Sequence, residues 1–343
     1  MNLSDPILAH FFEQGVVKPN IIDFWPAHVR IIMTSIFVVL TLIGVTGNIM
    51  VIFVVFKVPH MISPTNCYLV SLAASDCLFF LVTTPSELGH LHFNDQYIYV
   101  LNGQITISIY ISDYIFGSIG CALFSYLPYL AINTSSTSIA AFTIERYIGI
   151  CYPLKARYIC TVRRAQHIIL ILWSCCALYN SPWLYLAALQ EKGGEYTCNF
   201  KLQREHLTYK VMFLSDLTIF YAIPMILYIV LYSHIALTLR QSSASIKEDK
   251  RPLKSEIILL IKMLAIVAIV FGACWLPYRF MVTYNSFAQD KWDPDWYIFF
   301  SKTLVYINCA VNPILYNVMS VRFRDAFRQL FRGRSTEGCL KLT

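Results

Sequence analysis

Seven long apolar segments alternate with more polar ones along most of the chain. A helix that crosses a bilayer needs about 20 mainly apolar residues, and each of these segments reaches that length. They are Ile31–Phe56, Asn66–Pro85, Gly120–Ile144, Ala165–Leu189, Thr208–Leu239, Ile257–Thr283 and Trp296–Met319. The pattern predicts an all-α membrane protein whose seven-helix bundle occupies residues 31–319.

The segment Tyr97–Phe116 is also fairly apolar and could be counted as an eighth helix. Its β-branched and tyrosine-rich pattern favours a long ordered loop or hairpin instead. With seven helices, Lys57 and the basic clusters at 155–164, 240–254 and 322–334 all fall on one side, and positive charge marks the cytoplasmic side. We therefore expect a plasma-membrane protein with an extracellular tail over residues 1–30 and a long outer loop over about residues 87–118.

An amphipathic pattern follows the seventh segment. In Val321–Phe331 the apolar residues recur at helical spacing and three arginines fall between them. This predicts an interfacial helix over residues 320–332, with its apolar face in the lipid and its basic residues toward anionic headgroups. In the cytoplasmic tail that follows, residues 333–343, Cys339 is a candidate for palmitoylation, with an unmodified thiol as the alternative.

Composition supports a membrane protein and excludes several other classes. Only 14% of the residues are charged, against about 25% in ordinary soluble domains. The net charge of +7 lies in particular loops, so it indicates orientation rather than binding to nucleic acid. No CxxC spacing, Ser-His-Asp set or glycine-rich phosphate loop is present, so we expect neither an enzyme nor a cofactor. Asn2 begins a glycosylation sequon on the outer tail.

The third segment ends in a pair of adjacent charges. Within Ser136–Leu154, a run of small and apolar residues stops at Glu145-Arg146-Tyr147. An arginine at mid-membrane costs about 2.5–3.5 kcal/mol, and less near the interface, so the pair needs a partner, an aqueous cavity or a functional role. The alternative is a cytoplasmic flank whose arginine reaches the membrane surface.

Polar and proline residues inside other segments indicate a polar interior and helices that can bend. Asp76 lies in the middle of the second segment, and an intramembrane carboxylate is a candidate functional site. Pro224, Pro277 and Pro313 each free a backbone carbonyl and allow a kink. This combination is typical of a protein that switches between two states.

Taken together, these motifs resemble the rhodopsin-like (class A) G-protein-coupled receptors. The matches come in order, one set per segment, over residues 31–333. They are Asn48, Leu72–Asp76, Cys121, Glu145-Arg146-Tyr147 with Pro153, Trp173, Pro224 with Tyr232, Cys274-Trp275-Leu276-Pro277 and Asn312-Pro313-Ile314-Leu315-Tyr316.

The resemblance implies roles for particular residues. The activation switch would consist of Glu145, Arg146, Tyr147, Pro224, Tyr232, Phe271, Trp275, Asn312, Pro313 and Tyr316. Contacts with a heterotrimeric G protein would come from Arg146, Pro153 and Leu154. A disulfide would join Cys121 to Cys198 in the oxidising outer space, with two free thiols as the alternative. An allosteric sodium ion would lie among Asp76, Ser135, Asn308 and Asn312, the alternative being a neutral, hydrogen-bonded acid. Arrestin and a receptor kinase would be further partners.

A narrower resemblance to thyrotropin-releasing hormone receptors covers Ser63–Ala73, Tyr126–Cys151, Lys262–Arg279 and Asn308–Ser320. In that family a Tyr and an Asn on the third helix, a Tyr on the sixth and an Arg on the seventh hold an amidated peptide. Tyr129, Asn133 and Tyr278 match, Arg279 is adjacent, and Lys302 replaces the arginine. Lysine keeps the charge but loses the bidentate fork. Packing only for Tyr278, an indirect role for Arg279 and a solvent-facing Lys302 are the alternatives.

The resemblance predicts a receptor for a short amidated neuropeptide that activates a G protein of the Gq class, through phospholipase C and calcium. The first outer loop is longer than the family leads us to expect, and Tyr114 replaces an expected tryptophan, so the ligand could differ from the hormone. Alternatives are a peptide receptor with an unrelated ligand, an opsin or a transporter. An opsin needs a lysine where Tyr306 stands, and no inverted repeats suggest a transporter.

Overall fold

The computed structural model describes residues 26–92, 100–101, 104–105, 117–192, 195–202, 206–243, 251–290 and 292–331. The predicted glycosylation site at Asn2, the predicted palmitoylation site at Cys339 and Tyr114 lie outside these residues. So do the tail residues 333–343 and most of the tail over residues 1–30.

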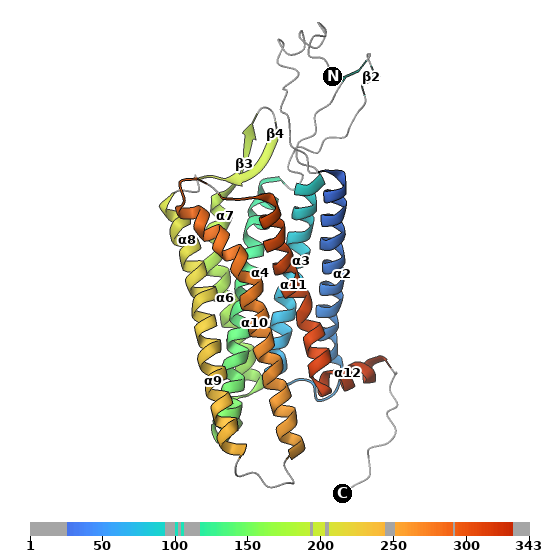
Figure 1. Cartoon of the computed structure of the whole chain (residues 1–343), viewed down its shortest axis with the longest axis vertical. Helices are drawn as coiled ribbons and strands as arrows, with labels where there is room; N and C mark the ends of the chain where they lie inside the picture. Colours follow the sequence, from blue (N-terminus) through green and yellow to red (C-terminus); the bar gives the residue numbers. More distant parts are fainter. Residues whose placement is uncertain are drawn as a thin grey trace.

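Long helices run side by side and form a single bundle (Figure 1). Five of them are continuous: α2 (Ala27–Lys57), α3 (Pro64–His92), α4 (Gly117–Cys151), α10 (Arg251–Phe287) and α11 (Asp295–Met319). Two are composite: α6 (Val162–Asn180) with α7 (Pro182–Leu186), and α8 (Leu207–Leu217) with the π-helical turn η1 (Thr218–Ala222) and α9 (Ile223–Ser243). This confirms the predicted seven-helix fold class.

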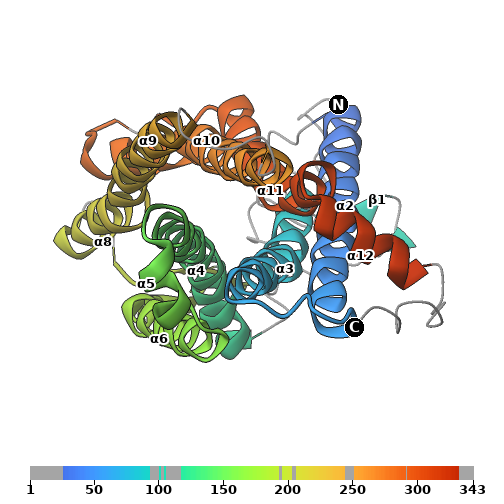
Figure 2. The same ribbon diagram turned by 90° about the horizontal axis from the view of Figure 1, so that it is seen from below.

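Six of these seven are long and apolar enough to cross a membrane, and α4 is the exception. Its polar run Asn133–Ser138 lowers its mean hydropathy. Viewed along the bundle, α4 lies among α3, α6 and α9 and packs against all three (Figure 2). Because Asn133, Thr134, Ser135, Ser136 and Ser138 are all buried, their polar groups face other helices rather than lipid.

A β-hairpin stands at one end of the bundle, and we call this the hairpin end (Figure 1). Strand β3 (Ala187–Lys192) pairs antiparallel with β4 (Glu195–Phe200), so that Leu189 stands opposite Cys198. The disulfide Cys121–Cys198, predicted from the sequence, fastens β4 to α4 with a Cα–Cα distance of 5.5 Å. The predicted span Ala165–Leu189 extends too far at its C-terminal end, because α7 ends at Leu186 and β3 begins at the next residue.

The predicted outer loop begins later than expected, because α3 continues to His92. Within the loop, β1 (Val100–Leu101) pairs antiparallel with β2 (Gln104–Ile105). The next helix, α4, begins at Gly117, whose φ of 62° lies in the left-handed region that favours glycine.

At two prolines within the helices, a side chain from a neighbouring helix donates a hydrogen bond to the carbonyl that the proline leaves unpaired. A proline cannot donate to the carbonyl four residues earlier, and an unpaired carbonyl is costly away from water. For Pro224 that carbonyl belongs to Phe220 in η1, and the Ser136 hydroxyl of α4 donates to it at 2.6 Å. For Pro313 it belongs to Cys309, and the Asn48 amide of α2 donates to it at 3.1 Å.

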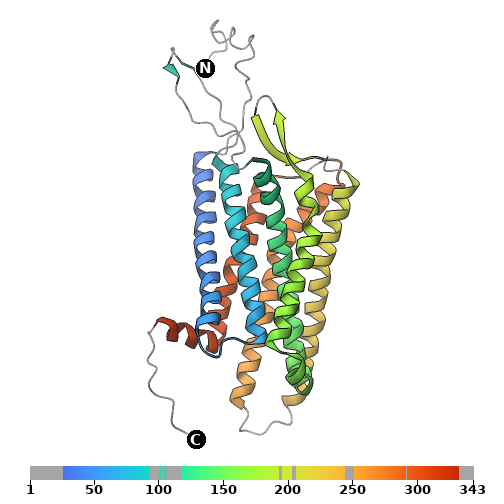
Figure 3. The ribbon, with the colours of Figure 1, turned by 180° about the vertical axis from the view of Figure 1, so that it is seen from behind.

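The opposite end carries two short helices, α5 (Pro153–Ile159) and α12 (Val321–Phe331), and we call it the α12 end (Figure 3). Phe323 and Ala326 of α12 are buried, and the Phe323 ring lies 6.0 Å from that of Tyr316. The Arg328 side chain is 67% exposed. The helix thus has the apolar and basic faces that the sequence pattern predicts.

Candidate functional site

A cavity of about 360 Å³ opens between α3, α4, α10 and α11 near the hairpin end. Tyr129, Tyr278 and Lys302, three of the five predicted ligand residues, line it. Most of the remaining lining is apolar, including Phe79, Phe124, Pro128, Ile132, Trp275 and Val305. The volume is at the small end of the range for ligand pockets, which suits a small molecule or a few residues of a peptide.

An ion pair lies in the wall of this cavity. The Lys302 ammonium of α11 donates to the Glu87 carboxylate of α3 at 2.7 Å, and the two side chains are 29% and 13% exposed. Lys302 therefore faces the cavity and not only solvent. Glu87 was not among the predicted site residues, because it follows the predicted end of the second span at Pro85 and was assigned to the loop.

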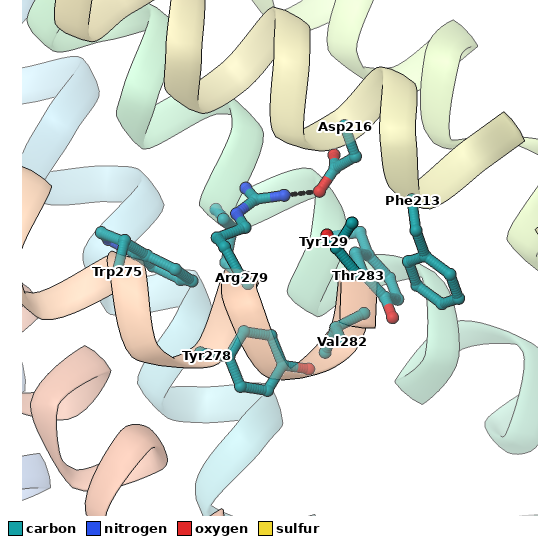
Figure 4. Close-up of a pocket in the computed structure, with 9 residues that line it drawn as sticks. Tyr129, Phe213, Asp216, Trp275, Tyr278, Arg279, Val282 and Thr283 are labelled. Carbon is teal, nitrogen blue, oxygen red and sulfur yellow. Dashed lines mark ion pairs between the residues drawn. The ribbon is translucent and has the colours of Figure 1, made fainter. Parts of the chain in front are cut away.

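Arg279 and Asn133, the other two predicted ligand residues, belong to a buried polar network. The Arg279 guanidinium forms an ion pair with Asp216 of α8 (Figure 4). The Asn133 amide donates to Asp216 at 2.8 Å and to Asn180 at 3.2 Å, and Arg279 donates to the Asn133 oxygen at 3.4 Å. All four residues are at most 7% exposed. A carboxylate inside an apolar span was the signal that could have identified Asp216.

Aromatic side chains separate this network from the main cavity. A second cavity of about 10 Å³, close to the least that holds one water molecule, is lined by Asp216 and Arg279 (Figure 4). The two cavities share Tyr129, Ile132, Trp275 and Tyr278 in their walls. A ligand in the larger cavity would therefore contact the two tyrosines directly and reach Arg279 only through them.

Trp183, which was not among the predicted site residues, stacks on the ring of Tyr129. Their rings stack with centroids 4.4 Å apart and an interplanar angle of 4°. Phe200, at the end of β4, lies 5.4 Å from Trp183 and also lines the cavity. The disulfide-anchored hairpin is thus connected to the cavity wall through stacked rings.

A column of rings continues from the cavity toward the middle of the bundle. Trp275 lies below Arg279, whose guanidinium carbon is 5.5 Å from the indole ring. The Phe271 ring is 6.3 Å from Trp275 and 6.3 Å from Tyr228. Two predicted switch residues, Trp275 and Phe271, therefore connect the cavity wall with the core between α9 and α10.

The architecture agrees with the result of a comparison with protein families. It consists of seven helices and a hairpin that a disulfide joins to α4, with prolines at positions 224 and 313. Residues 47–316 match the model of the 7 transmembrane receptor (rhodopsin family). The chain belongs to this receptor family. Its members are receptors rather than enzymes.

Relatives of this receptor include receptors named for thyrotropin-releasing hormone and for neuromedin U. The thyrotropin-releasing hormone receptor of Mus musculus is 37% identical over 330 residues, covering 88% of this chain and 79% of the relative. That of Homo sapiens is 38% identical over 317 residues, covering 84% and 75%. Neuromedin-U receptor 2 of Mus musculus is 29% identical over 318 residues, covering 87% and 74%. The protein is thus a G-protein-coupled peptide receptor related to thyrotropin-releasing hormone receptors.

Deeper in the receptor, Asp76 accepts two hydrogen bonds. The Ser135 hydroxyl donates to one carboxylate oxygen at 3.2 Å, and the Asn312 amide donates to the other at 2.8 Å. Asn308 is buried one turn before Asn312, and none of the residues described forms a hydrogen bond with its amide nitrogen. The structure thus places Ser135 and Asn312 directly on Asp76, with Asn308 on the same helix as Asn312.

At the α12 end of the receptor, Arg146 and Glu145 stand side by side with unused hydrogen-bonding capacity. Arg146 Nε and Glu145 Oε1 are buried, and neither atom has a hydrogen-bond partner in the part of the chain that the structure describes. The Tyr232 hydroxyl lies 3.1 Å from that of Thr143, and the Tyr147 ring packs 5.6 Å from His234. Tyr232 is therefore engaged by α4 one turn away from Arg146.

Other predicted residues lie at the same end of the receptor. Pro153 begins α5, and Leu154, the next residue, is 76% exposed. Tyr316 is buried, and its hydroxyl has no hydrogen-bond partner within the described ranges. Leu154 is thus an exposed apolar residue at the same end of the receptor as Arg146, where a docking protein could contact it.

Proposed function

We propose that this receptor binds a short, C-terminally amidated peptide and activates a heterotrimeric G protein of the Gq class, with phospholipase C and calcium downstream. The main support is the cavity in which Tyr129, Tyr278 and Lys302 meet, because these are the positions that match the peptide-holding residues of thyrotropin-releasing hormone receptors. Its modest volume favours a short peptide over a large one.

The hairpin end would face the outside of the cell, in the plasma membrane. A disulfide forms in oxidising compartments, and Cys121–Cys198 lies at this end. Basic residues such as Lys57 and Arg322 lie at the α12 end, and positive charge marks the cytoplasmic side. Because α2 begins at the hairpin end, the N-terminal tail would be extracellular (Figure 1).

Ligand binding would act through differential affinity for two arrangements of the bundle. A peptide in the cavity presses on Tyr129, Tyr278 and Trp275, which form the wall in front of the buried network. Trp275 and Phe271 transmit a shift to α9 and α10, and Arg146 becomes available to the G protein at the other end. Arrestin and a receptor kinase would share that surface, as expected of the family.

The test is a calcium assay in transfected cells with a panel of short amidated peptides. At least one peptide is expected to give a calcium response that untransfected cells do not show. Lys302→Arg is expected to answer the same peptides, because the charge is kept, with altered potency because a guanidinium has different geometry. Silence of the surface-expressed receptor toward the whole panel would contradict the proposed ligand class, and inhibition of adenylate cyclase without calcium would contradict Gq coupling.

We further infer a sodium ion at Asp76. The groups around the fully buried carboxylate are neutral: Ser135 and Asn312 donate hydrogen bonds to it, and the Cys309 thiol lies within hydrogen-bonding reach. No ion pair among the described residues compensates its charge. A hard cation takes oxygen ligands of the kind that Asp76, Ser135, Asn308 and Asn312 carry.

The sodium site predicts a change in the salt dependence of binding. Asp76→Asn removes the charge, so agonist affinity is expected to become insensitive to replacing sodium by a large organic cation. Radioligand binding to membranes in matched ionic strength measures this, with Ser71→Ala as a buried polar control outside the site. Undiminished sodium sensitivity in Asp76→Asn would rule out the ion at this position.

A further inference from the structure

Glu87 and Lys302 place one negative and one positive charge side by side in the wall of an otherwise mainly apolar cavity. Their contact joins one carboxylate oxygen to the ammonium nitrogen at 2.7 Å. An ammonium has three N–H donors and a carboxylate has two acceptor oxygens, so the contact uses only part of their capacity. Both side chains remain partly accessible, at 29% and 13%.

The ion pair of Arg279 and Asp216 differs in this respect. It is less exposed, and Asn133 takes up further hydrogen-bonding capacity of both partners. That pair bonds mainly within the protein and does not line the larger cavity, although the buried Arg279 Nε lacks a hydrogen-bond partner among the described residues. The pair of Glu87 and Lys302 instead offers unused donors and acceptors toward the space that a ligand would fill.

We propose that Glu87 and Lys302 together form a subsite for a neutral primary amide at the end of the ligand, and that the pair rejects a free carboxylate at that end. This rests on the proposed peptide-receptor function and specifies which terminal chemistry the site accepts. Glu87 is the specificity-determining residue, and it is the member of the pair that the resemblance to hormone receptors did not identify.

The chemistry of the amide matches both charges at once. Its N–H groups donate to the Glu87 carboxylate, and its carbonyl oxygen accepts from the Lys302 ammonium. Hydrogen bonds to charged groups are stronger than those between neutral groups. Because the amide is neutral, the subsite keeps its zero net charge when the ligand is bound.

A free carboxylate would meet opposing forces in the same place. It would be attracted by Lys302 but would lie beside the like charge of Glu87, and a partly buried site screens this repulsion poorly. A lysine without Glu87 would bind a carboxylate well. The acidic partner therefore converts a potential carboxylate site into one that discriminates against carboxylates.

The test compares short amidated peptides with free acids of the same sequences, in binding and calcium assays. Wild type is expected to prefer the amide by on the order of 100-fold. Glu87→Gln removes the repelling charge, so the free acid should gain and the preference should fall to roughly tenfold or less. Lys302→Gln should weaken both forms. Asp295→Asn, which removes an acidic charge at the start of α11 outside the residues that line the cavity, is the matched control and should keep the wild-type preference.

The outcomes separate this proposal from the proposed function. An unchanged amide preference in a surface-expressed Glu87→Gln variant would overturn the subsite while leaving the receptor a peptide receptor. Equal or better binding of the free acids by wild type would do the same. No binding of any amidated peptide by wild type would overturn both.

Discussion

Asp216→Asn is expected to destabilise the receptor by about 3 kcal/mol, because removing one partner of a buried ion pair leaves the other charge uncompensated. Arg279 is 7% exposed and would lose its counter-ion, while an asparagine at position 216 could still accept from Asn133. Thermal unfolding of the purified receptor in detergent should show a midpoint lowered by several degrees. Peptide binding measured at low temperature should be affected less than stability, since Arg279 lies behind the cavity wall.

A double variant separates charge from packing. Asp216→Asn combined with Arg279→Gln removes both charges, so its loss of stability should be smaller than that of Asp216→Asn alone. Arg328→Gln is the matched control, because its ion pair with Asp325 is exposed and should contribute at most about 0.5 kcal/mol. Equal effects of Asp216→Asn and Arg328→Gln would show that the buried pair is not a structural requirement.

Arg146→Ala is expected to keep peptide binding and to lose most of the nucleotide exchange on the G protein. Seventeen residues separate Tyr129 from Arg146 along α4, which places them about 25 Å apart. The substitution therefore leaves the cavity intact while removing a guanidinium whose Nε has no hydrogen-bond partner among the described residues. Exchange of labelled guanine nucleotide on purified G protein, beside radioligand binding, measures both properties.

Arg163→Ala provides the control for this experiment. Arg163 lies at the same end of the bundle, at the exposed start of α6, so its loss changes the charge of that end equally. It should retain most of the exchange activity. Full exchange by Arg146→Ala would show that this arginine does not take part in coupling to the G protein.

The helices were predictable from the sequence because each transmembrane segment must be apolar over a fixed length. Even α4 was identified, despite its polar run, because apolar residues such as Ile132 and Ile139 flank that run. The disulfide could be predicted as well, since Cys121 and Cys198 stand at outer helix ends and loops. The end of α7 was misplaced because an apolar composition continues from Tyr185 into β3.

The details that depend on contacts between distant residues could not be predicted. In the π-helical turn η1, the Phe220 carbonyl accepts a hydrogen bond from the Ser136 hydroxyl of α4. The hydrophobic pattern of the chain around η1 does not indicate this contact with another helix. The family resemblance named Asn133 and Arg279 separately, and only the fold shows that Asp216 joins them. Glu87 belongs to the site because α3 continues about two turns beyond Pro85, to His92.

The ion pair of Arg279 with Asp216 joins α10 to α8, and this contact has a mechanical consequence. Arg279 lies about 12 Å along the helix from the Phe287 end and about 42 Å from the Arg251 end. If α10 turned as a rigid rod about the point where Asp216 holds it, a displacement beside the hairpin would be magnified roughly 3.5-fold at the opposite tip. A displacement of about one bond length near the peptide would then become several bond lengths at the Arg251 end of α10, where a partner protein could enter.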